Sequence, residues 1–303
     1  MAAVATGDNM SNCFADGLPA GQLDRAPFQF RHALLDHPAL AIEGLAKILP
    51  ELPPERVRYS RGLADLRINF DHAHVEHRNG MGLEETIETI RAGNSYIAVS
   101  DPEAHPAFRG LYDDLCREMT ALLREGGRSK AIHEPRMWLF IASPNAITPF
   151  HFDRYSNVLM QIRGSKQVAV FPNFRPDIVP VDVCEAYMDR QAIEPLWRDE
   201  LDQHAIKFQF RPGDALHIPY TSGHYVKNGA EDVSISLSFF FQTDETLRWT
   251  RAMRFNHRWR RWSTAVGLRP TPVGHSHWLD AAKSHALPCA EAMGRVARRL
   301  RSV

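Results

Sequence analysis

Three residues, two near the middle of this chain and one further on, could bind one metal ion together. His151 and Asp153 are two positions apart, and in an extended strand such a pair lies on one face. His224, which follows a short turn after Gly213-Asp214, would complete a set of two imidazoles and one carboxylate. That ligand set with open coordination positions is typical of non-haem Fe(II) oxygenases.

The His-x-Asp pair means little without its surroundings, because the chain has 15 His and is 24% charged. About one such pair is expected by chance, and a solvated or core pair is the alternative interpretation. Apolar strand candidates at 137–142 and 158–162 flank the pair, and another at 215–219 precedes His224. Ligands so far apart in the chain require a closed β architecture such as a barrel or jelly roll.

The elements that would position these residues divide the chain into three parts. Residues 1–25 are small and polar and are predicted to be a disordered tail. Residues 26–244 are predicted to form one catalytic domain whose core, 136–243, is a double-stranded β-helix (jelly-roll). Apolar periodicity predicts helices near 40–48, 83–90 and 108–122 and a strand at 66–70. Further core strands are predicted at 167–171, 206–210 and 233–241, and 245–303 is predicted to be helical.

Two parts of the core carry a family resemblance. The first is the ungapped spacing of Thr148, His151, Asp153, Asn157, Gly164 and Lys166, and the second is Gly213-Asp214 with Pro219 and His224. Over roughly a third of its length, the chain resembles the JmjC and cupin-like Fe(II)/2-oxoglutarate oxygenases. Within them it is most similar to the asparaginyl hydroxylase that acts on hypoxia-inducible factor.

The resemblance implies a role for each matching residue. His151, Asp153 and His224 would hold Fe(II), and Lys166 would pair with the distal carboxylate of 2-oxoglutarate. The residues implied to complete the co-substrate pocket are Thr148, Tyr96 and Asn157, with Ser238 where the family member has an asparagine. The implied reaction uses O2 to hydroxylate a C–H bond, with release of succinate and CO2, in a protein or peptide side chain or a small molecule.

The chemistry of Lys166 fits that role independently. A dianion inside a barrel needs a buried cation at its far end, and an ammonium on a strand can supply it. The alternative is that Lys166 begins its strand on the solvent side, as most lysines would. Two other functions stay open: a metal-cupin enzyme that does not use 2-oxoglutarate, and a non-catalytic JmjC-like regulatory protein.

Other histidines could also bind metal or border the cavity. His72, His74 and Glu76 would share one face if their segment were a strand, although a surface or cavity-wall cluster is the favoured interpretation. His275 and His277 lie in a connection that contains Pro and Gly. His217 either borders the cavity or is a hydrogen-bonded core residue.

The composition of the chain indicates which binding partners and which cellular compartment to expect. The formal net charge is zero, which argues against nucleic acid or a membrane as partner. No apolar run of about 20 residues occurs and the N-terminus lacks a signal-peptide pattern, so a cytoplasmic location is expected. Cys13, Cys116, Cys184 and Cys289 lack paired spacing and are expected to be free thiols.

The C-terminal segment repeats aromatic residues at helical spacing. Phe255, Trp259, Trp262 and Val266 recur every three or four residues among arginines. Such a pattern can contact RNA, but a stripe buried against the barrel or a second subunit is favoured, and a homodimer is expected. In the insertion before residue 204, Tyr187, Met188 and Trp197 are expected to pack in the core rather than to contact substrate.

Overall fold

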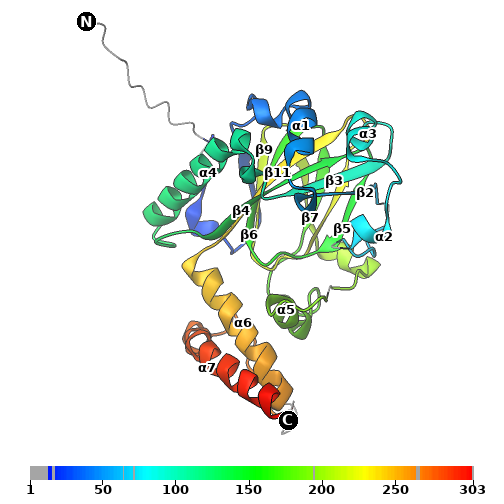
Figure 1. Ribbon diagram of the computed structural model, residues 1–303. Helices are drawn as coiled ribbons and strands as arrows, with labels where there is room; N and C mark the ends of the chain where they lie inside the picture. Colours follow the sequence, from blue (N-terminus) through cyan, green and yellow to red (C-terminus); the bar gives the residue numbers. More distant parts are fainter. Residues whose placement is uncertain are drawn as a thin grey trace, which may run out of the picture.

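Two antiparallel sheets form the centre of the computed structural model, which describes residues 13–15, 18–63, 65–70, 72–193, 195–263 and 267–301 (Figure 1). The larger sheet has the strand order β1-β9-β6-β11-β4-β3-β2, and the smaller has the order β5-β10-β7-β8. The strands of the larger sheet are β1 (Phe28–Arg31), β2 (Val57–Arg61), β3 (Ser95–Ser100), β4 (His133–Ala142), β6 (Ser156–Arg163), β9 (Asp214–Ile218) and β11 (Ser234–Gln242). Those of the smaller sheet are β5 (Ile147–His151), β7 (Lys166–Val170), β8 (Ile206–Phe210) and β10 (His224–Asn228). The predicted jelly-roll core is confirmed.

The helices lie outside the two sheets. They are α1 (Ile42–Ile48), α2 (Ala73–Glu76), α3 (Leu83–Glu88), α4 (Pro106–Glu125), α5 (Val181–Met188), α6 (Asp244–Ser263) and α7 (His277–Arg301). Helix α4 begins with Pro106 after His105, whose ring accepts a hydrogen bond from the backbone of Ala107. Its apolar stripe, which includes Leu111 and Leu115, packs on the outer face of the larger sheet.

The two sheets pack directly against each other at one end and enclose a cavity at the other. At the packed end, Leu159 and Leu216 of the larger sheet contact Val168 and Val170 of the smaller one. Successive strand residues point to opposite faces, so Lys166 shares the inner face of β7 with these two valines. The apolar layer therefore joins the sheets at one end and leaves room between them at the other.

The N-terminal segment contradicts the predicted tail wherever it is described. Phe14, Leu18 and Leu23 are buried in the main core. The carboxylate of Asp24 accepts hydrogen bonds from Ser156 Oγ at 2.7 Å and from the backbone of Tyr220 at 2.9 Å. Residues 18–25 are therefore ordered, because their few apolar side chains complete a core that the rest of the chain leaves open. The other residues of the predicted tail, 1–12, 16 and 17, lie outside the described residues.

The strand predicted at 66–70 is also wrong. The segment turns instead, because the Asp65 carboxylate accepts a hydrogen bond from the backbone of Arg67 at 3.0 Å, an interaction that competes with strand pairing. Residues 73–76 form helix α2 rather than a strand.

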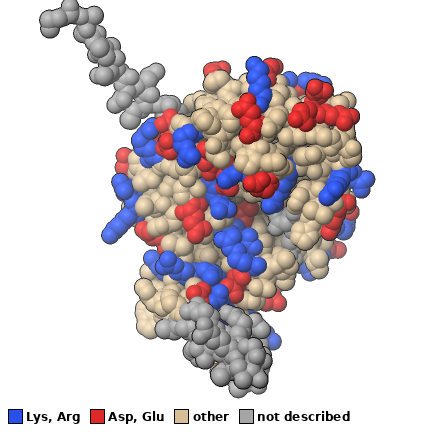
Figure 2. Space-filling model, in the orientation of Figure 1, with Lys and Arg blue, Asp and Glu red and all other residues tan. Residues whose placement is uncertain are grey.

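Surface charge and hydropathy agree with the composition. Acidic and basic side chains are interspersed over the face in Figure 2. None of the described helices combines the length and the apolar character needed to cross a bilayer. Cys13, Cys116 and Cys184 are free thiols as predicted, while the side chain of Cys289 lies outside the described part of the chain.

Candidate active site

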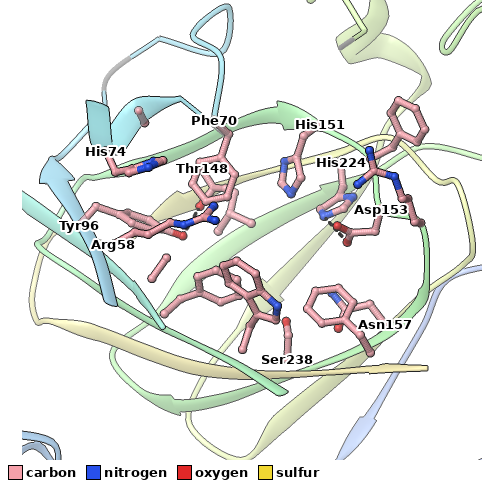
Figure 3. Close-up of a pocket in the computed structure, with 18 of the residues that line it drawn as sticks. Arg58, Phe70, His74, Tyr96, Thr148, His151, Asp153, Asn157, His224 and Ser238 are labelled. Atoms are coloured by element: carbon pink, nitrogen blue, oxygen red, sulfur yellow. Dashed lines mark hydrogen bonds and ion pairs between the residues drawn. The ribbon is translucent and has the colours of Figure 1, made fainter. Parts of the chain in front are cut away.

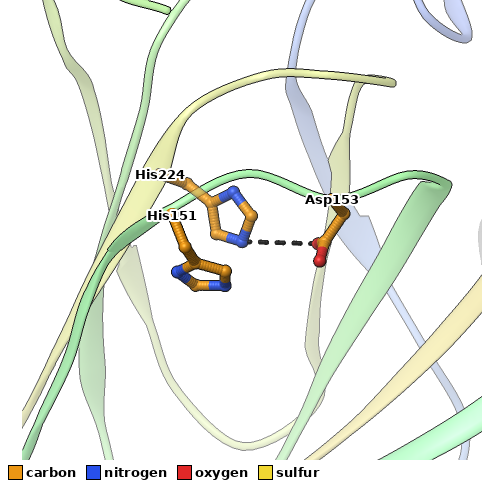
Figure 4. Close-up of side chains that lie close together, drawn as sticks. All are labelled: His151, Asp153 and His224. Atoms are coloured by element: carbon orange, nitrogen blue, oxygen red, sulfur yellow. Dashed lines mark ion pairs between the residues drawn. The ribbon is translucent and has the colours of Figure 1, made fainter. Parts of the chain in front are cut away.

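His151, Asp153 and His224 converge at one point between the sheets (Figure 4). One ligand atom from each lies within 4.8 Å of the others, and no other three acidic, His or Cys residues of the described chain do so. The two imidazole centroids are 4.2 Å apart, and Nε2 of His224 lies 3.6 Å from Oδ2 of Asp153. The predicted ligands are thus brought together with a donor set of two nitrogens and one carboxylate.

Backbone carbonyls fix both imidazoles in the orientation that a metal requires. Nδ1 of His151 donates to the carbonyl of Pro149 at 2.8 Å, and Nδ1 of His224 donates to that of Ser222 at 3.0 Å. Each Nε2 is therefore left as the ligating nitrogen. Burial, and secondarily the nearby His151, hold the pKa of His224 well below its usual value. The ring is neutral near pH 7, as metal binding requires.

Pairing of β5 with β10 produces this convergence. His151 ends β5 and His224 begins β10, and the two are direct partners in the register. Asp153 lies two residues beyond the strand, so the prediction that both ligands sit on a strand face is wrong in detail. The ladder ends at the His151–His224 pair, and Asp153 approaches from the loop that leads to β6.

The remaining predicted site residues line one cavity of about 750 Å³ with the metal ligands (Figure 3). The hydroxyls of Tyr96 and Thr148 are hydrogen-bonded at 3.0 Å. Asn157 is 3% exposed, and its Oδ1 is buried with no hydrogen-bond partner among the described residues, so it can accept from a ligand. Ser238 lies on the floor of the same cavity (Figure 3).

Lys166 faces the interior, and the solvent-side alternative is wrong. Its side chain is 6% exposed, and Nζ donates to Ser236 Oγ at 2.8 Å. Among the described residues, no carboxylate lies within 4.0 Å of this ammonium. Burial lowers the pKa of Lys166 to about 7. A buried cation with a single hydroxyl partner at the wall of a cavity fits a carboxylate ligand.

The other histidine clusters do not form metal sites in the described chain. His72, His74 and Glu76 line the cavity wall on and before α2, so the cavity-wall interpretation holds. His217 is a core residue whose Nε2 accepts from the backbone of Asp24 at 2.9 Å. His277 lies 2.6 Å from Arg248 at the start of α7.

Several cavity residues were missed in the sequence. Ser236 shares the inner face of β11 with Ser238, so strand periodicity could have found it. Tyr187 lines the cavity, against expectation, whereas Met188 and Trp197 pack in the core as expected. Four arginines also line the cavity, and no spacing rule identifies them: Arg58, Arg136, Arg154 and Arg190.

Comparison with known proteins finds relatives that share this region. The model of a family described as a cupin-like domain matches residues 57–246, a range that contains all three candidate metal ligands. JmjC domain-containing protein F of Dictyostelium discoideum is 26% identical over 196 residues, which are 52% of this chain and 40% of that protein. The matched region therefore spans well under half of the relative's length.

Two solved structures are similar to this chain at lower sequence identity. E. coli ycfD is 14% identical, with a TM-score of 0.47, over 92% of this chain and 68% of its own. A variant of Bacillus subtilis oxalate decarboxylase is 19% identical, with a TM-score of 0.25, over 38% of this chain and 24% of its own.

Proposed function

We propose that this chain, which belongs to the family of cupin-like domains, is an Fe(II)- and 2-oxoglutarate-dependent oxygenase. It would hydroxylate a C–H bond, in a protein or peptide side chain, with release of succinate and CO2. JmjC and cupin-like domains include enzymes of this type. Close similarity to the asparaginyl hydroxylase and a cytoplasmic location stay predictions.

One observation carries the proposal: Lys166 and the three candidate metal ligands line the same cavity. A metal at His151, Asp153 and His224 would attract one end of an anionic chelator, and the buried ammonium would attract the other. A molecule with a carboxylate at each end, such as 2-oxoglutarate, satisfies both charges. Without such a ligand, burial of the charged Lys166 side chain lowers the stability of the fold.

Different residues of the cavity would hold the metal, orient the co-substrate and exclude water. The two imidazoles and the Asp153 carboxylate would hold Fe(II), and Fe(II) with 2-oxoglutarate would supply the oxidising chemistry. The Tyr96 and Thr148 hydroxyls, already hydrogen-bonded to each other, can both turn toward the distal carboxylate. Aromatic side chains of the inner face, Trp138 and Phe140 among them, exclude water from the reacting centre.

Replacement of a metal ligand tests the assignment. His151→Ala and Asp153→Ala should each abolish the succinate that the protein forms from 2-oxoglutarate with Fe(II), ascorbate and O2. They should also weaken Mn(II) binding, since each removes one of three ligands. His275→Ala, at an exposed histidine that does not line the cavity, is the matched control and should retain both properties. If both ligand variants kept forming succinate, the metal assignment would be wrong.

Lys166 separates this function from a cupin enzyme that does not use 2-oxoglutarate. Lys166→Ala should weaken 2-oxoglutarate binding to the Mn(II)-loaded protein by about 100-fold, because a charge-assisted contact in a buried site is lost. Calorimetry measures this directly. An unchanged dissociation constant would favour a metal-cupin reaction without this co-substrate, and a wild type that binds 2-oxoglutarate without turnover would favour a regulatory protein.

A further inference from the structure

The cavity carries more positive charge than the metal and co-substrate chemistry uses. Among the residues that the structure describes, two carboxylates line it, Glu76 and Asp153. The cationic side chains that line it are Lys166, Arg58, Arg136, Arg154 and Arg190. The proposed function assigns Lys166 to the co-substrate, and the positive charge of the metal would be balanced by Asp153 and the co-substrate. The guanidinium groups are left without an assigned partner.

Arg58 belongs to a different element of the cavity wall, strand β2, than the other three arginines. Arg58 lies beside Tyr96 and Thr148, on the side expected to hold 2-oxoglutarate (Figure 3). Arg154 directly follows the candidate ligand Asp153, Arg136 lies on β4, and Arg190 follows α5. Arg136, Arg154 and Arg190 are therefore the basic groups that remain for the substrate.

In the described part of the chain, these three arginines have no carboxylate partner of the kind that other arginines have. Arg128 pairs with Glu245 at 2.9 Å, and Arg258 pairs with Asp189 at 2.7 Å. Within the described ranges, no carboxylate lies within 4.0 Å of the guanidinium of Arg136, Arg154 or Arg190. A nearby acidic group is Glu134, which accepts a hydrogen bond from Tyr155 at 3.0 Å. Glu134 offsets part of this charge, but three arginines against one glutamate leave an excess of positive charge among the described side chains.

Aromatic rings contact the guanidinium groups of two of these arginines, Arg154 and Arg136. The Arg154 guanidinium carbon lies 3.5 Å from the Tyr187 ring centroid, and Nε donates to the Tyr187 carbonyl at 2.8 Å. Arg136 lies 5.6 Å from the ring of Tyr155. Burial raises the pKa of Tyr155 and the charges of Arg136 and Arg190 oppose that rise, so both lie near one phenol. Stacking orders a guanidinium while leaving in-plane N–H groups to bind a carboxylate.

We infer that the substrate is an acidic peptide segment, in which an Asp or Glu side chain close to the oxidised residue binds Arg136, Arg154 and Arg190. This inference rests on the proposed function for the reaction, and it adds the chemistry that selects the substrate. A peptide is favoured over nucleic acid because the basic groups gather at one side of a cavity, whereas the formal net charge is zero and the surface shown in Figure 2 mixes both signs.

Two labelled peptide pools test the inference by binding alone. Each pool has a randomised central residue, flanked by glutamates in one pool and by glutamines in the other. Fluorescence anisotropy is measured with the full chain, Mn(II) and 2-oxoglutarate. The glutamate pool should bind about tenfold more tightly at low salt, and this preference should shrink as salt screens the charges.

Arginine variants test whether the preference for the glutamate pool comes from this side of the cavity. Arg136→Gln/Arg154→Gln should lower the affinity for the glutamate pool to that for the glutamine pool, while Arg109→Gln, at an exposed residue of α4, should not. Circular dichroism would verify that the double variant is folded. Equal affinity of the wild type for both pools would overturn the inference, and so would a preference that survives in the double variant. Tighter, arginine-dependent binding of a ten-nucleotide oligouridylate would replace it with RNA recognition.

The result is independent of turnover. Because Mn(II) supports binding without requiring oxidation, loss of acid preference leaves the Fe(II) and 2-oxoglutarate assignments intact. Conversely, absence of succinate formation would refute the proposed reaction without changing the measured peptide preference.

Discussion

At the scale of single residues, Lys166 makes the sharpest prediction about stability. Its pKa is lowered to about 7 by burial, from an ordinary value of 10.5. Below pH 7 the folded protein must keep a buried ammonium, and between about pH 7 and 10.5 the folded state binds fewer protons than the unfolded chain. Stability from this group therefore increases with pH across that window.

Lys166→Met should stabilise the co-substrate-free protein by about 1 to 3 kcal/mol near neutral pH, since it replaces a buried cation with an apolar side chain of similar length. Its advantage over the wild type should shrink toward about pH 10. Urea unfolding at several pH values measures both effects. Lys47→Met, at an exposed lysine of α1, is the control and should change little. A Lys166→Met protein that is less stable at neutral pH would contradict this account.

The sequence predicts the metal ligands and Lys166 better than it predicts the arginines of the cavity wall. His151, Asp153, His224 and Lys166 have a spacing that identifies their chemistry, and the structure brings the four to one cavity. Arg136 is different, because its position depends on how β4 lies opposite the loop that follows β5. A long-range arrangement of this kind leaves no local pattern, so the basic side of the cavity could not be predicted.

At the scale of elements, the turn between β6 and β7 decides where Lys166 lies. Gly164 and Ser165 carry the chain from the larger sheet to the smaller one. Gly164 has φ +68°, and a Cβ there would lie 2.5 Å from the carbonyl oxygen of Val233. Both the backbone conformation and the close approach require glycine.

Gly164→Ala should therefore cost about 2 to 4 kcal/mol of unfolding free energy, and it should weaken 2-oxoglutarate binding by moving Lys166. Gly127→Ala isolates the first contribution, because Gly127 has φ +63° but no atom within 4 Å of an added Cβ. That control should lose only about 1 kcal/mol. Chemical denaturation compares the two, and equal losses would show that the Val233 contact is unimportant.

Most strands of the central core were predictable, whereas the strands that extend the larger sheet were not. The prediction at 206–210 matches β8, and that at 158–162 lies inside β6. No range was predicted for β1, β2 and β3 of the larger sheet or for β5 and β10 of the smaller sheet. Strand β2 (Val57–Arg61) has only Val57 and Tyr59 as apolar residues, so its conformation depends on pairing with β3 rather than on its own sequence.

At the scale of the whole molecule, the C-terminal helices extend away from the sandwich (Figure 1). Helices α6 and α7 pack against each other, but Trp259 and Trp278 remain 45% and 72% exposed. Phe255 stacks on Trp259 as the predicted stripe requires, while the side chains of Trp262 and Val266 lie outside the described residues. Large exposed aromatics on a protruding helix pair are typical of a protein interface.

We expect this helix pair to form a homodimer interface, because a second copy would cover the exposed tryptophans and remove apolar surface from water. Light scattering after size-exclusion chromatography should give a dimer mass at micromolar concentration. Trp278→Ser with Leu279→Ser should shift the protein to monomer, because both side chains are exposed on α7. Ile206→Ser, which removes an exposed apolar side chain from β8, should leave the dimer intact. A monomeric wild type would refute the dimer, and the cavity, whose lining residues all precede residue 244, would then have to function within a single chain.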